Sequence, residues 1–474
     1  MPQDAEVPAV LNDAVGARRG RGLKTLEVDE ELMQDIRGLI GERAMPVLWN
    51  ILVDLHSADI ADIINHLEGD ERHFVFNLLD VAVSSEVLLE LDPAVRQALL
   101  EVLPQEKITA LVGQLDSDDA ADIVAELSST IADRVLRAIP AKESTDVKEL
   151  LRYPEDTAGG IMATEFAAVH KNDTVKKAIR KVREKAKEDL VIHNVFVTDD
   201  DGVLVGVIPL QSLVLQAPNR RIHKIMEADI KSVTTNVDQE EVAQMFKKYD
   251  LLSLPVVDGR GRLVGRITID DIVDVIEEEH TEDVARIIGS DVEEMERRSP
   301  SQIALLRLPW VLMTLGIEFL AGVVIHFFDQ TLGQVILLAS FMPIISAISG
   351  NTGLQSAAIV IRALSTGHMS VEQWWRPVSR QLQTTTIIGG VCGLVIGAIG
   401  ALWHGRWEFG MIVGSSMFVS VNLSGMVGTV VPMISKRLGF DPAITAGPFE
   451  TAFQDVMGIT IFLGLATAML QWIL

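Results

Sequence analysis

The second half of the chain alternates long apolar runs with short polar connections. A helix needs about 20 apolar residues to cross a hydrocarbon core of about 30 Å. Five runs are that long, and they cover residues 308–328, 332–363, 384–403, 409–434 and 444–474. The pattern therefore predicts five membrane-spanning helices, of which the second and fifth are long enough to be tilted or broken.

The connections between these runs differ in their basic residues. Those before the first run, between the second and third, and between the fourth and fifth hold every Lys and Arg of this region except Arg406. The positive-inside rule places these connections and the N-terminal half in the cytoplasm, and the C-terminus outside. The first twenty residues contain no apolar segment as long as that of a signal peptide, so we expect the soluble part to stay in the cytoplasm and the spans to lie in the plasma membrane.

The first half of the chain begins with short helical patterns that repeat. The segments "LHSADIADIINHL" (residues 55–67) and "LDSDDAADIVAEL" (residues 115–127) align without gaps. In both, apolar residues recur at helical intervals behind an acidic start. This pattern predicts an all-α superhelical domain of stacked short helices over residues 29–140, after a flexible segment of residues 1–28.

Residues 141–269 change to alternating short strands and helices, and the same order occurs twice. Each copy has a strand, a helix and two further strands joined by a glycine-containing turn, as in "NVFVTDDDGVLVGVIPLQSLV" and "SLPVVDGRGRLVGRITIDDIV". This order indicates a tandem pair of α/β modules. A long, very acidic connecting helix is expected over residues 270–300, and a transmembrane domain of five helices over residues 301–474.

The net charge of −25 lies entirely in residues 1–300, because the remaining residues carry seven basic and seven acidic side chains. So acidic a surface repels nucleic acid, and it attracts divalent cations where carboxylates crowd together. We expect most acids of the helical repeats to cap helices or to face solvent. The single cysteine, Cys392, excludes an intramolecular disulfide and any multi-cysteine metal site.

Asp455 lies within the fifth apolar run. A carboxylate at mid-span costs about 2.5–3.5 kcal/mol on insertion scales, so it ordinarily faces a partner or a cavity. All basic residues of the membrane half lie at the ends of the runs or in the connections, so we expect no buried ion pair. Asp455 is therefore a candidate ion site, with a protonated, hydrogen-bonded carboxyl group as the alternative. Glu318 in the first run raises the same question, and the pattern leaves it open.

The second run contains the polar segment "FMPIISAISGNTGLQSA". Pro343 removes a backbone donor, and Asn351 and Gln355 are one turn apart on one face. Irregular backbone at membrane depth is tolerated only where protein or water covers it. Two interpretations stay open: hydrogen bonds between helices, or a helix interruption at Gly350 and Gly353 that lines a water-filled path together with Asn351 and Gln355.

The third run places Gly389, Gly393 and Gly397 on one face at intervals of four residues. Small residues at this spacing let two helix backbones approach closely. We interpret the three glycines as a helix-packing face and assign them no chemistry.

The tandem modules resemble a pair of cystathionine-β-synthase-type (CBS) modules. Such pairs commonly bind adenine nucleotides, and the ribose-binding pattern of that family, G-x-x-T-x-x-D, is matched by Gly265, Thr268 and Asp271. The first copy departs from the pattern, with Pro209 and Ser212 where Thr and Asp are expected. The resemblance thus implies at most one ATP site, and structural use of the modules without nucleotide is the alternative.

Acidic helical repeats, paired CBS modules, an acidic helix and five spans, in that order, resemble the MgtE family of magnesium channels. The most specific segments are "GNTGLQSA", "YPEDTAGGIM", "DQEEVAQMFKKYDLLSLPVVD" and "DPAITAGPFETAFQDVMG". The resemblance implies a homodimer in the lipid bilayer with a pore on its two-fold axis, in which Asp455 holds a hydrated Mg²⁺ and the Thr451 carbonyl and Gly447 lie near the same path. The chain departs from the family at Leu354, where Asn is frequent, and at Glu318, which is not a family feature.

Regulatory Mg²⁺ ions bridge the soluble domains in this family. The resemblance transfers their carboxylate ligands to the second CBS module, to the connecting helix and to the helical domain of this chain, namely to Asp238, Glu240, Asp250, Asp271, Asp274, Glu279, Glu282, Asp118 and Asp122.

Together, the patterns and the resemblance predict a Mg²⁺-selective channel that admits Mg²⁺ passively and is closed by cytoplasmic Mg²⁺. The alternative is a proton-coupled secondary transporter of divalent cations that uses Asp455 or Glu318. A third class, a receptor whose membrane half is only an anchor, is disfavoured by the polar groups within the spans. We expect no enzyme, because an intramembrane aspartyl protease needs a second Asp at depth and the pattern shows none.

Overall fold

The computed structural model describes residues 28–186, 191–287, 300–366, 369, 374–443 and 447–473. The chain divides into two compact units between Val273 and Asp274, and we call them the soluble unit and the membrane unit. The expected flexible segment of residues 1–28, apart from its last residue, lies outside the described residues, as do residues 288–299 of the expected connecting helix.

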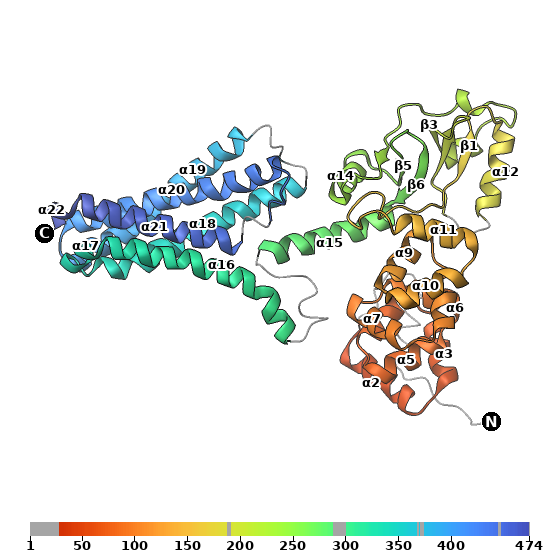
Figure 1. Ribbon diagram of the computed structural model, residues 1–474, viewed down its shortest axis with the longest axis horizontal. Helices are drawn as coiled ribbons and strands as arrows, with labels where there is room; N and C mark the ends of the chain where they lie inside the picture. Colours follow the sequence, from red (N-terminus) through yellow and green to blue (C-terminus); the bar gives the residue numbers. More distant parts are fainter. Residues whose placement is uncertain are drawn as a thin grey trace. The chain divides into compact units, whose positions relative to one another are not determined.

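The soluble unit begins with short helices stacked on one another (Figure 1). They are α2 (Glu30–Gly41), α3 (Met45–Val53), α4 (Ser57–Asn65), α5 (Gly69–Leu78), α6 (Val81–Leu89), α7 (Pro93–Val102), α8 (Gln105–Val112), α9 (Ser117–Glu126), α10 (Ser129–Ala138) and α11 (Ala141–Leu150). The repeated segments fold as α4 and α9. Both helices bury the same apolar positions, Ile60, Ile63 and Ile64 in the first and Ala120, Ile123 and Val124 in the second. The predicted array of stacked helices is confirmed.

Two small mixed sheets follow, one for each predicted α/β module. The first has the order β1 (Ala168–His170), β2 (Asn194–Thr198), β3 (Leu204–Pro209), and the second has the order β4 (Val233–Thr234), β5 (Ser253–Val257), β6 (Leu263–Thr268). In each sheet the first pair of strands is parallel and the second pair antiparallel, with Ala168 opposite Phe196 and Val195 opposite Ile208 in the first. The second sheet repeats this pattern and its β-bulge, so the tandem arrangement is confirmed.

The helices of these modules are α12 (Val175–Lys185), α13 (Leu210–Val214), α14 (Gln239–Tyr249) and the short 3₁₀ helix η2 (Ile222–Lys224). The glycine-containing turns place Gly202 and Gly261 at φ values of 79° and 77°, which favour glycine. Each turn also bonds to the other module, because Leu204 donates its N–H to the Gly261 carbonyl and Leu263 donates to the Gly202 carbonyl. The two turns therefore join the modules to each other.

The membrane unit contains five helices that are long and apolar enough to span a bilayer. They are α16 (Pro300–Phe327), α18 (Leu338–Ser365), α19 (Trp375–His404), α20 (Trp407–Arg437) and α21 (Pro448–Ala468). The short helices α17 (Asp329–Gln334) and α22 (Leu470–Ile473) precede α18 and follow α21, so the second and fifth apolar runs are broken as expected. The acidic helix α15 (Ile269–Ile287) connects the two units in sequence.

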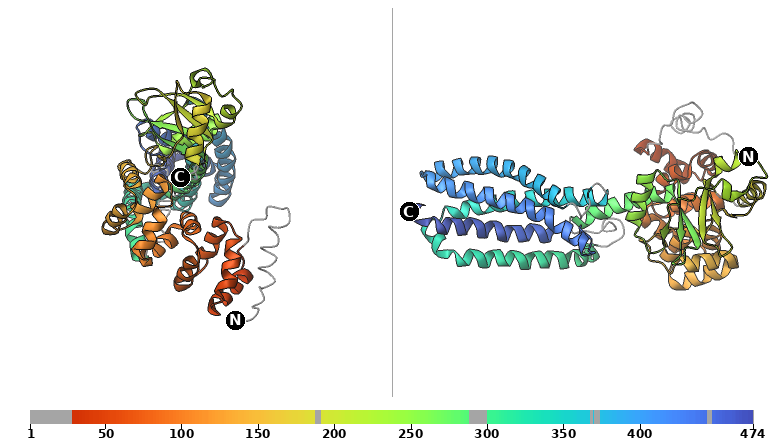
Figure 2. Two further views of the ribbon diagram at one scale, coloured as in Figure 1. Left: turned by 90° about the vertical axis from the view of Figure 1, so that its right-hand side faces the viewer. Right: turned by 90° about the horizontal axis from the view of Figure 1, so that it is seen from above.

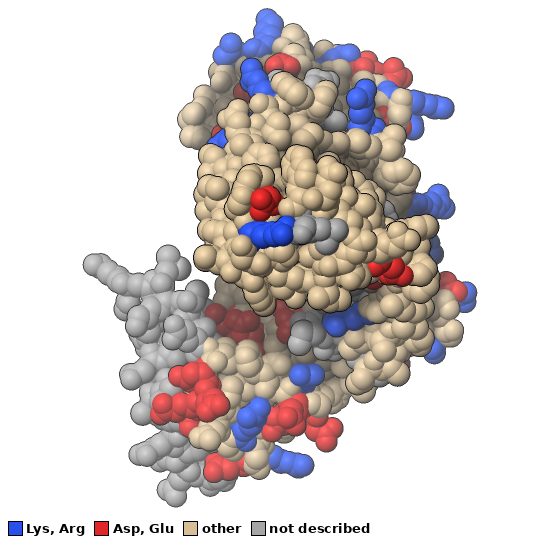
Figure 3. Space-filling view, turned by 90° about the vertical axis from the view of Figure 1, so that its left-hand side faces the viewer, with Lys and Arg blue, Asp and Glu red and all other residues tan. Residues whose placement is uncertain are grey.

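Helix α20 has a central place in the bundle, since it packs against α18, α19 and α21, while α16 packs against α21. Figure 2 shows these helices running side by side. The core between them includes Phe341, Phe409, Phe462 and Leu463. Figure 3, which looks onto one end of the membrane unit, shows only a few Lys, Arg, Asp and Glu side chains there. Large apolar side chains cover the outer faces of α16 and α19. This surface suits a lipid environment.

Helices α19 and α20 meet through their glycines. A Cβ atom on Gly393 would lie 2.6 Å from the Gly414 carbonyl oxygen, and one on Gly397 would lie 2.7 Å from that of Gly410. Neither distance leaves room for a side chain, because the contacted atoms belong to the backbone of the other helix. The predicted glycine packing face is confirmed.

We expect Gly397→Val to destabilise the membrane unit, since its side chain would force α19 away from α20. Overpacking of this kind costs about 1–3 kcal/mol. The measurement is the midpoint of thermal unfolding in detergent, which should fall. The matched control is Gly390→Val on the same helix, where a Cβ atom meets nothing within 4 Å. Equal midpoints for the two variants would contradict the packing role of Gly397.

Candidate metal centres

Asp455 lies about two turns into α21 and is half-buried. Its Oδ1 atom accepts a hydrogen bond from Ser346 Oγ of α18, and its carboxyl group lies close to that of Glu318 on α16. Three helices therefore bring two carboxyl groups and one hydroxyl group together within the membrane unit.

The carboxyl groups of Asp455 and Glu318 have no basic partner within the described residues. Among the described residues of the membrane unit, Arg286 forms ion pairs with Glu282 and Asp441, and His326 forms one with Asp329. That Asp455 lacks a buried ion pair stays a prediction. Its negative charge, when present, is available to a cation.

The face of α21 that carries Asp455 also carries Thr451, one turn earlier. Gly350 of α18 approaches this face, and a Cβ atom on it would lie 3.4 Å from Thr451 Cγ2 and 3.7 Å from Asp455 Oδ1. Gly447 is the N-cap residue of α21, and its carbonyl oxygen accepts from the backbone of Glu450 and Thr451. Gly447, Thr451 and Asp455 thus follow one another along the first two turns of α21, and their role as ion ligands stays a prediction.

The expected helix interruption at Gly350 and Gly353 is wrong, because α18 is continuous from Leu338 to Ser365. Gly353 makes room for a neighbouring helix instead, because a Cβ atom on it would lie 1.9 Å from Gln454 Nε2 of α21. The other interpretation, hydrogen bonding between helices, is confirmed, although serines make those bonds. Besides the bond of Ser346 to Asp455, Gln381 Nε2 of α19 donates to Ser356 Oγ over 2.6 Å.

Asn351 and Gln355 lie one turn apart on the exposed face of α18. The structure does not bring them to Asp455, whose contact on α18 is Ser346. Within one chain they line no path, and their pore-lining role stays a prediction about an assembly of chains.

A second polar cluster, which the sequence analysis missed, lies on an adjacent face of α21. Glu450 and Gln454 are only 2% and 3% exposed, and Gln454 Nε2 donates to Glu450 Oε1 over 2.7 Å. Ser424 of α20 donates to Gln454 Oε1 and to the Ser349 carbonyl. The other Glu450 oxygen, Oε2, has no hydrogen-bond partner among the described residues. The spacing of four between Glu450 and Gln454 was the available signal, since it places both on one helix face.

The soluble unit gathers acids from α9 and from the start of α15. Asp118 is buried, so it is an exception to the expectation that most acids of the repeats cap helices or face solvent. Burial, followed by the charges of Asp119 and Asp271, raises the pKa of Asp118 well above its usual value. Burial and the charge of Asp271 also raise the pKa of Asp119, to about 7. The exposed Asp122 adds to that repulsion. A cation would relieve the strain between these carboxylates.

The proposed ligands of the second CBS module cap α14. Asp238 Oδ1 accepts from the Glu240 N–H over 2.9 Å at the beginning of the helix, while Asp250 ends it in the left-handed conformation at φ 50°. Gln244 donates to the Glu240 side chain. Asp238 and Asp250 therefore lie at opposite ends of an 11-residue helix, and the structure does not bring them together.

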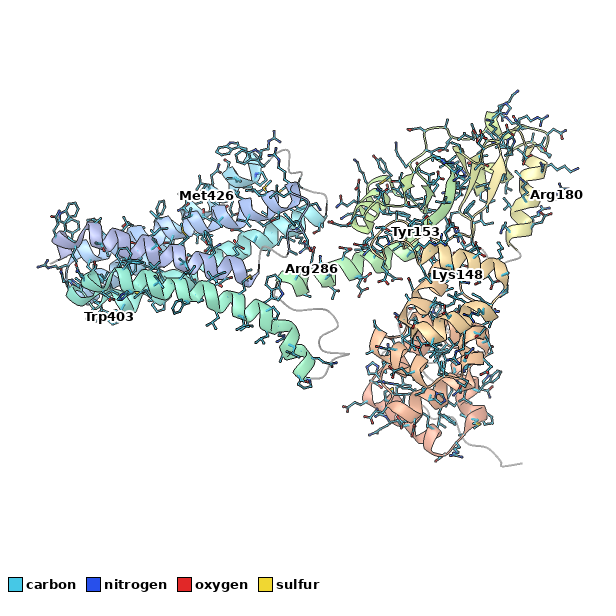
Figure 4. The ribbon with its side chains drawn as sticks, viewed as in Figure 1. Lys148, Tyr153, Arg180, Arg286, Trp403 and Met426 are labelled. Carbon is cyan, nitrogen blue, oxygen red and sulfur yellow. The ribbon has the colours of Figure 1, made fainter. Side chains whose placement is uncertain are left out.

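The end of α15 is tied to the membrane unit. Arg286, labelled in Figure 4, forms ion pairs with Glu282 one turn earlier and with Asp441, between α20 and α21. Asp283 accepts a hydrogen bond from Ser365 Oγ over 2.8 Å at the end of α18, and burial raises the pKa of Asp283. The sequence analysis did not single out Arg286 or Asp441. Of the other predicted ligands, Asp274 and Glu279 lie on the same helix.

No cluster of three or more His, Cys, Asp or Glu side chains within the described residues has the spacing that holds a metal ion. The carboxylates of Asp118, Asp119 and Asp271 nevertheless fit a regulatory Mg²⁺ chemically, since they supply oxygen ligands and repel one another in its absence.

The residues of the nucleotide-binding pattern, Gly265, Thr268 and Asp271, make contacts within the protein. A Cβ atom on Gly265 would lie 2.6 Å from Met162 Sδ, so a glycine is required there for packing. Asp271 Oδ2 accepts from both the N–H and the hydroxyl group of Thr268, over 3.0 and 2.7 Å. These contacts suffice to explain the three residues without a nucleotide, and ATP binding stays a prediction.

Family models cover most of the chain. A model described as divalent cation transporter matches residues 342–465, one described as the MgtE intracellular N domain matches residues 55–156, and the CBS domain matches residues 158–217 and 222–278. The first of these covers α18 to α21, and therefore Asp455.

Similar proteins agree with these matches. The magnesium transporter MgtE of Bacillus subtilis is 32% identical and covers 93% of this chain and 98% of its own length, and that of Thermus thermophilus is 32% identical and covers 94% and 100%. Among solved structures, the cytosolic domain of the Mg²⁺ channel MgtE in complex with ATP is 33% identical and covers 51% of this chain and 99% of its own, with a TM-score of 0.49.

The acids of α9 and of the start of α15 predict that the stability of the soluble unit depends on pH. Because the pKa of Asp119 is higher in the folded protein than in an unfolded chain, protonation favours the folded state, and stability falls as the pH rises from about 4 to about 7. Asp119→Asn resembles the protonated form. We expect it to raise the unfolding temperature of the soluble unit by a few degrees at pH 8, without Mg²⁺, and not at pH 4.

Scanning calorimetry of the full chain at both pH values measures this effect. Asp133→Asn on α10, where the side chain is exposed, is the matched control. A gain at pH 8 that is no larger for Asp119→Asn than for Asp133→Asn would contradict the repulsion.

Proposed function

Because the chain belongs to the MgtE family of magnesium transporters, we propose that it forms a Mg²⁺ channel in the plasma membrane, through which Mg²⁺ enters the cell passively. The observation that carries this proposal is the carboxyl group of Asp455. It lies within the bundle, contacts polar groups of two other helices and has no basic partner among the described residues.

The chemistry of Mg²⁺ suits such a site. Mg²⁺ gives up its water reluctantly and is held in proteins by one or two carboxylates and several retained waters. Asp455, with the Thr451 carbonyl one turn earlier and Gly447 at the start of α21, offers this kind of ligand set. In a homodimer with the path on its two-fold axis, the site has two copies of Asp455, and Asn351 and Gln355, exposed on α18, face the path or the second chain.

We propose that cytoplasmic Mg²⁺ closes the channel by binding the acids of the soluble unit and of α15. Asp118, Asp119 and Asp271 repel one another when no cation is present. Mg²⁺ removes this repulsion and shifts the protein toward a compact, closed state. The proposed ligands Asp122, Asp238, Glu240, Asp250, Asp274, Glu279 and Glu282 act in the same way. The ion pair of Arg286 with Asp441 supports a coupling of α15 to the segment just before α21.

The soluble unit lies in the cytoplasm and the C-terminus outside in this proposal, in accordance with the basic connections between the spans. The proposal also includes a single ATP site at Gly265, Thr268 and Asp271 of the second CBS module. The relative solved with ATP supports nucleotide binding as a property of similar proteins.

One observation favours a second function, proton-coupled transport of divalent cations. The carboxyl groups of Glu318 and Asp455 lie close together within the membrane unit, where two neighbouring negative charges repel each other and favour a proton on one of them. A cation that binds Asp455 would displace this proton, which then leaves to one side of the membrane. Release to a fixed side would couple the two fluxes.

We expect Asp455→Asn to reduce Mg²⁺ flux into liposomes at least about tenfold, because the neutral amide no longer attracts the cation. A fluorescent Mg²⁺ indicator inside the vesicles measures the initial rate. Thr460→Val is the matched control: its side chain lies on α21, is exposed and bonds only to the carbonyl of Val456 within its own helix. Normal flux in Asp455→Asn would contradict the assignment of the site.

The same vesicles separate the two functions. An imposed pH gradient should leave the initial rate of a passive channel unchanged once the membrane potential is clamped. Acceleration of Mg²⁺ uptake by that gradient would favour the proton-coupled transporter instead.

Closure by Mg²⁺ predicts protection from proteolysis. We expect millimolar Mg²⁺ to slow tryptic cleavage of the purified full chain within residues 270–300, because bound ions favour the compact state. KCl at equal ionic strength controls for charge screening. The double variant Asp118→Asn/Asp271→Asn should lose part of the protection, whereas Asp133→Asn should keep it. Equal cleavage of the unmodified chain with and without Mg²⁺ would rule out this form of gating.

A further inference from the structure

Glu318 is an acidic residue in the middle of a membrane-spanning helix and is exposed on the surface of the chain. Its neighbours on α16 include Leu315 and Phe319, which are 63% and 72% exposed and suit lipid or a second chain. A carboxyl group at this depth costs several kcal/mol unless it meets a polar partner or water. Its presence therefore calls for a partner within reach.

The partner that the structure gives it is Asp455. Helix α16 packs against α21, and the Glu318 carboxyl group lies close to that of Asp455. Ser346 Oγ of α18 donates a hydrogen bond to Asp455. Gly350, one turn after Ser346, has no side chain, and a Cβ atom on it would lie 3.7 Å from Asp455 Oδ1. Oxygen atoms of Glu318, Ser346 and Asp455 thus lie close together at the meeting of α16, α18 and α21.

These oxygens form the kind of set that a hard divalent cation requires. Mg²⁺ is held by one or two carboxylates, with waters completing an octahedron, and hydroxyl or carbonyl oxygens are common additional ligands. A single carboxylate is the minimum, and Glu318 supplies the second within the same chain. None of the described Lys, Arg or His side chains forms an ion pair with either acid, so no fixed positive charge competes for them.

We propose that Glu318 is the second carboxylate of the transported cation's site and sets its affinity. This proposal rests on the proposed function, since it concerns the same path. A cation held by Asp455 of one chain meets Glu318 of that chain as well, and a dimer places four carboxylates, rather than two, around the path. More negative charge holds a divalent cation more tightly and slows its release.

The consequence is a division of roles between the two acids. In this proposal Asp455 is needed for any passage, because it shares a face of α21 with Thr451. Glu318 adjusts how strongly the cation is held before it moves on. Removal of the Glu318 charge should therefore raise the cation concentration that half-saturates transport, while the maximal rate stays the same or increases.

The test measures Mg²⁺ flux into liposomes over a range of external Mg²⁺ for Glu318→Gln. We expect the half-saturating concentration to rise about fivefold or more, which corresponds to about 1 kcal/mol of binding free energy. Thr314→Val is the matched control: it lies one turn earlier on α16, and its hydroxyl group bonds only to carbonyls of its own helix. Its half-saturating concentration should not change.

The outcomes are distinct. An unchanged half-saturating concentration in Glu318→Gln, together with lost flux in Asp455→Asn, overturns the role of Glu318 and leaves the proposed function intact. Normal flux in Asp455→Asn overturns the proposed function instead. A lower maximal rate at an unchanged half-saturating concentration assigns Glu318 to packing and also overturns its role as a ligand.

Glu318→Asp provides a second variant if glutamine prevents folding. It keeps the carboxylate but shortens the side chain by one methylene, so the carboxylate no longer reaches the Asp455 site fully. A raised half-saturating concentration in this variant supports the proposal, and an unchanged one overturns it. The elution profile and unfolding temperature of each purified variant establish that the compared proteins are folded.

Discussion

Carboxylate charge without enough positive charge nearby is the constraint on which the rest of the structure depends. In the membrane unit, the carboxyl groups of Asp455 and Glu318 lie close together, and that of Glu450 is buried against Gln454. In the soluble unit, Asp118 is buried beside other acids. Each of these arrangements is costly in a low dielectric unless the acid is protonated, hydrogen-bonded or close to a positive charge. This cost is common to both units and underlies the proposal that cations bind them.

Close helix packing is what makes these polar contacts possible. Glycines on α18, α19 and α20 let the backbones approach until side chains on one helix reach groups on the next, as Gly353 does for Gln454. The same approach brings Ser346 to Asp455. A larger residue at these crossings would separate the helices and leave the polar groups unpaired in an apolar environment, which raises the free energy of the folded state. Packing and ion chemistry are therefore not separate properties of this bundle.

The sequence predicted what local patterns determine. Hydrophobic length identified the five spans, and the repeated order of strands and turns identified the two sheets, because both depend on residues close together in the chain. The packing face formed by the glycines of the third run was predicted correctly for the same reason. The helix interruption at Gly350 was wrong, because the glycine pattern does not distinguish a broken helix from one that another helix approaches closely.

Contacts between distant segments could not be predicted from the sequence. The burial of Asp118 depends on how α9 lies against the start of α15, and the proximity of Glu318 to Asp455 depends on which face of α16 meets α21. The polar cluster of Glu450 was not predicted, because Glu450 lies on a different face of α21 from Asp455. Its carboxyl group is directed into the bundle. Periodicity gives the face of a helix on which a residue lies, but not the partner that the face meets.

Arg286 adds a feature of a different kind to the acidic helix α15. A guanidinium group keeps its charge at any physiological pH, and it cannot diffuse away as a metal ion does. Its contacts with Glu282 and Asp441 therefore do not need a bound metal ion. They join the last turn of α15 to the segment between α20 and α21 by charges that belong to the chain itself. Because salt screens charges regardless of their identity, high ionic strength weakens this connection.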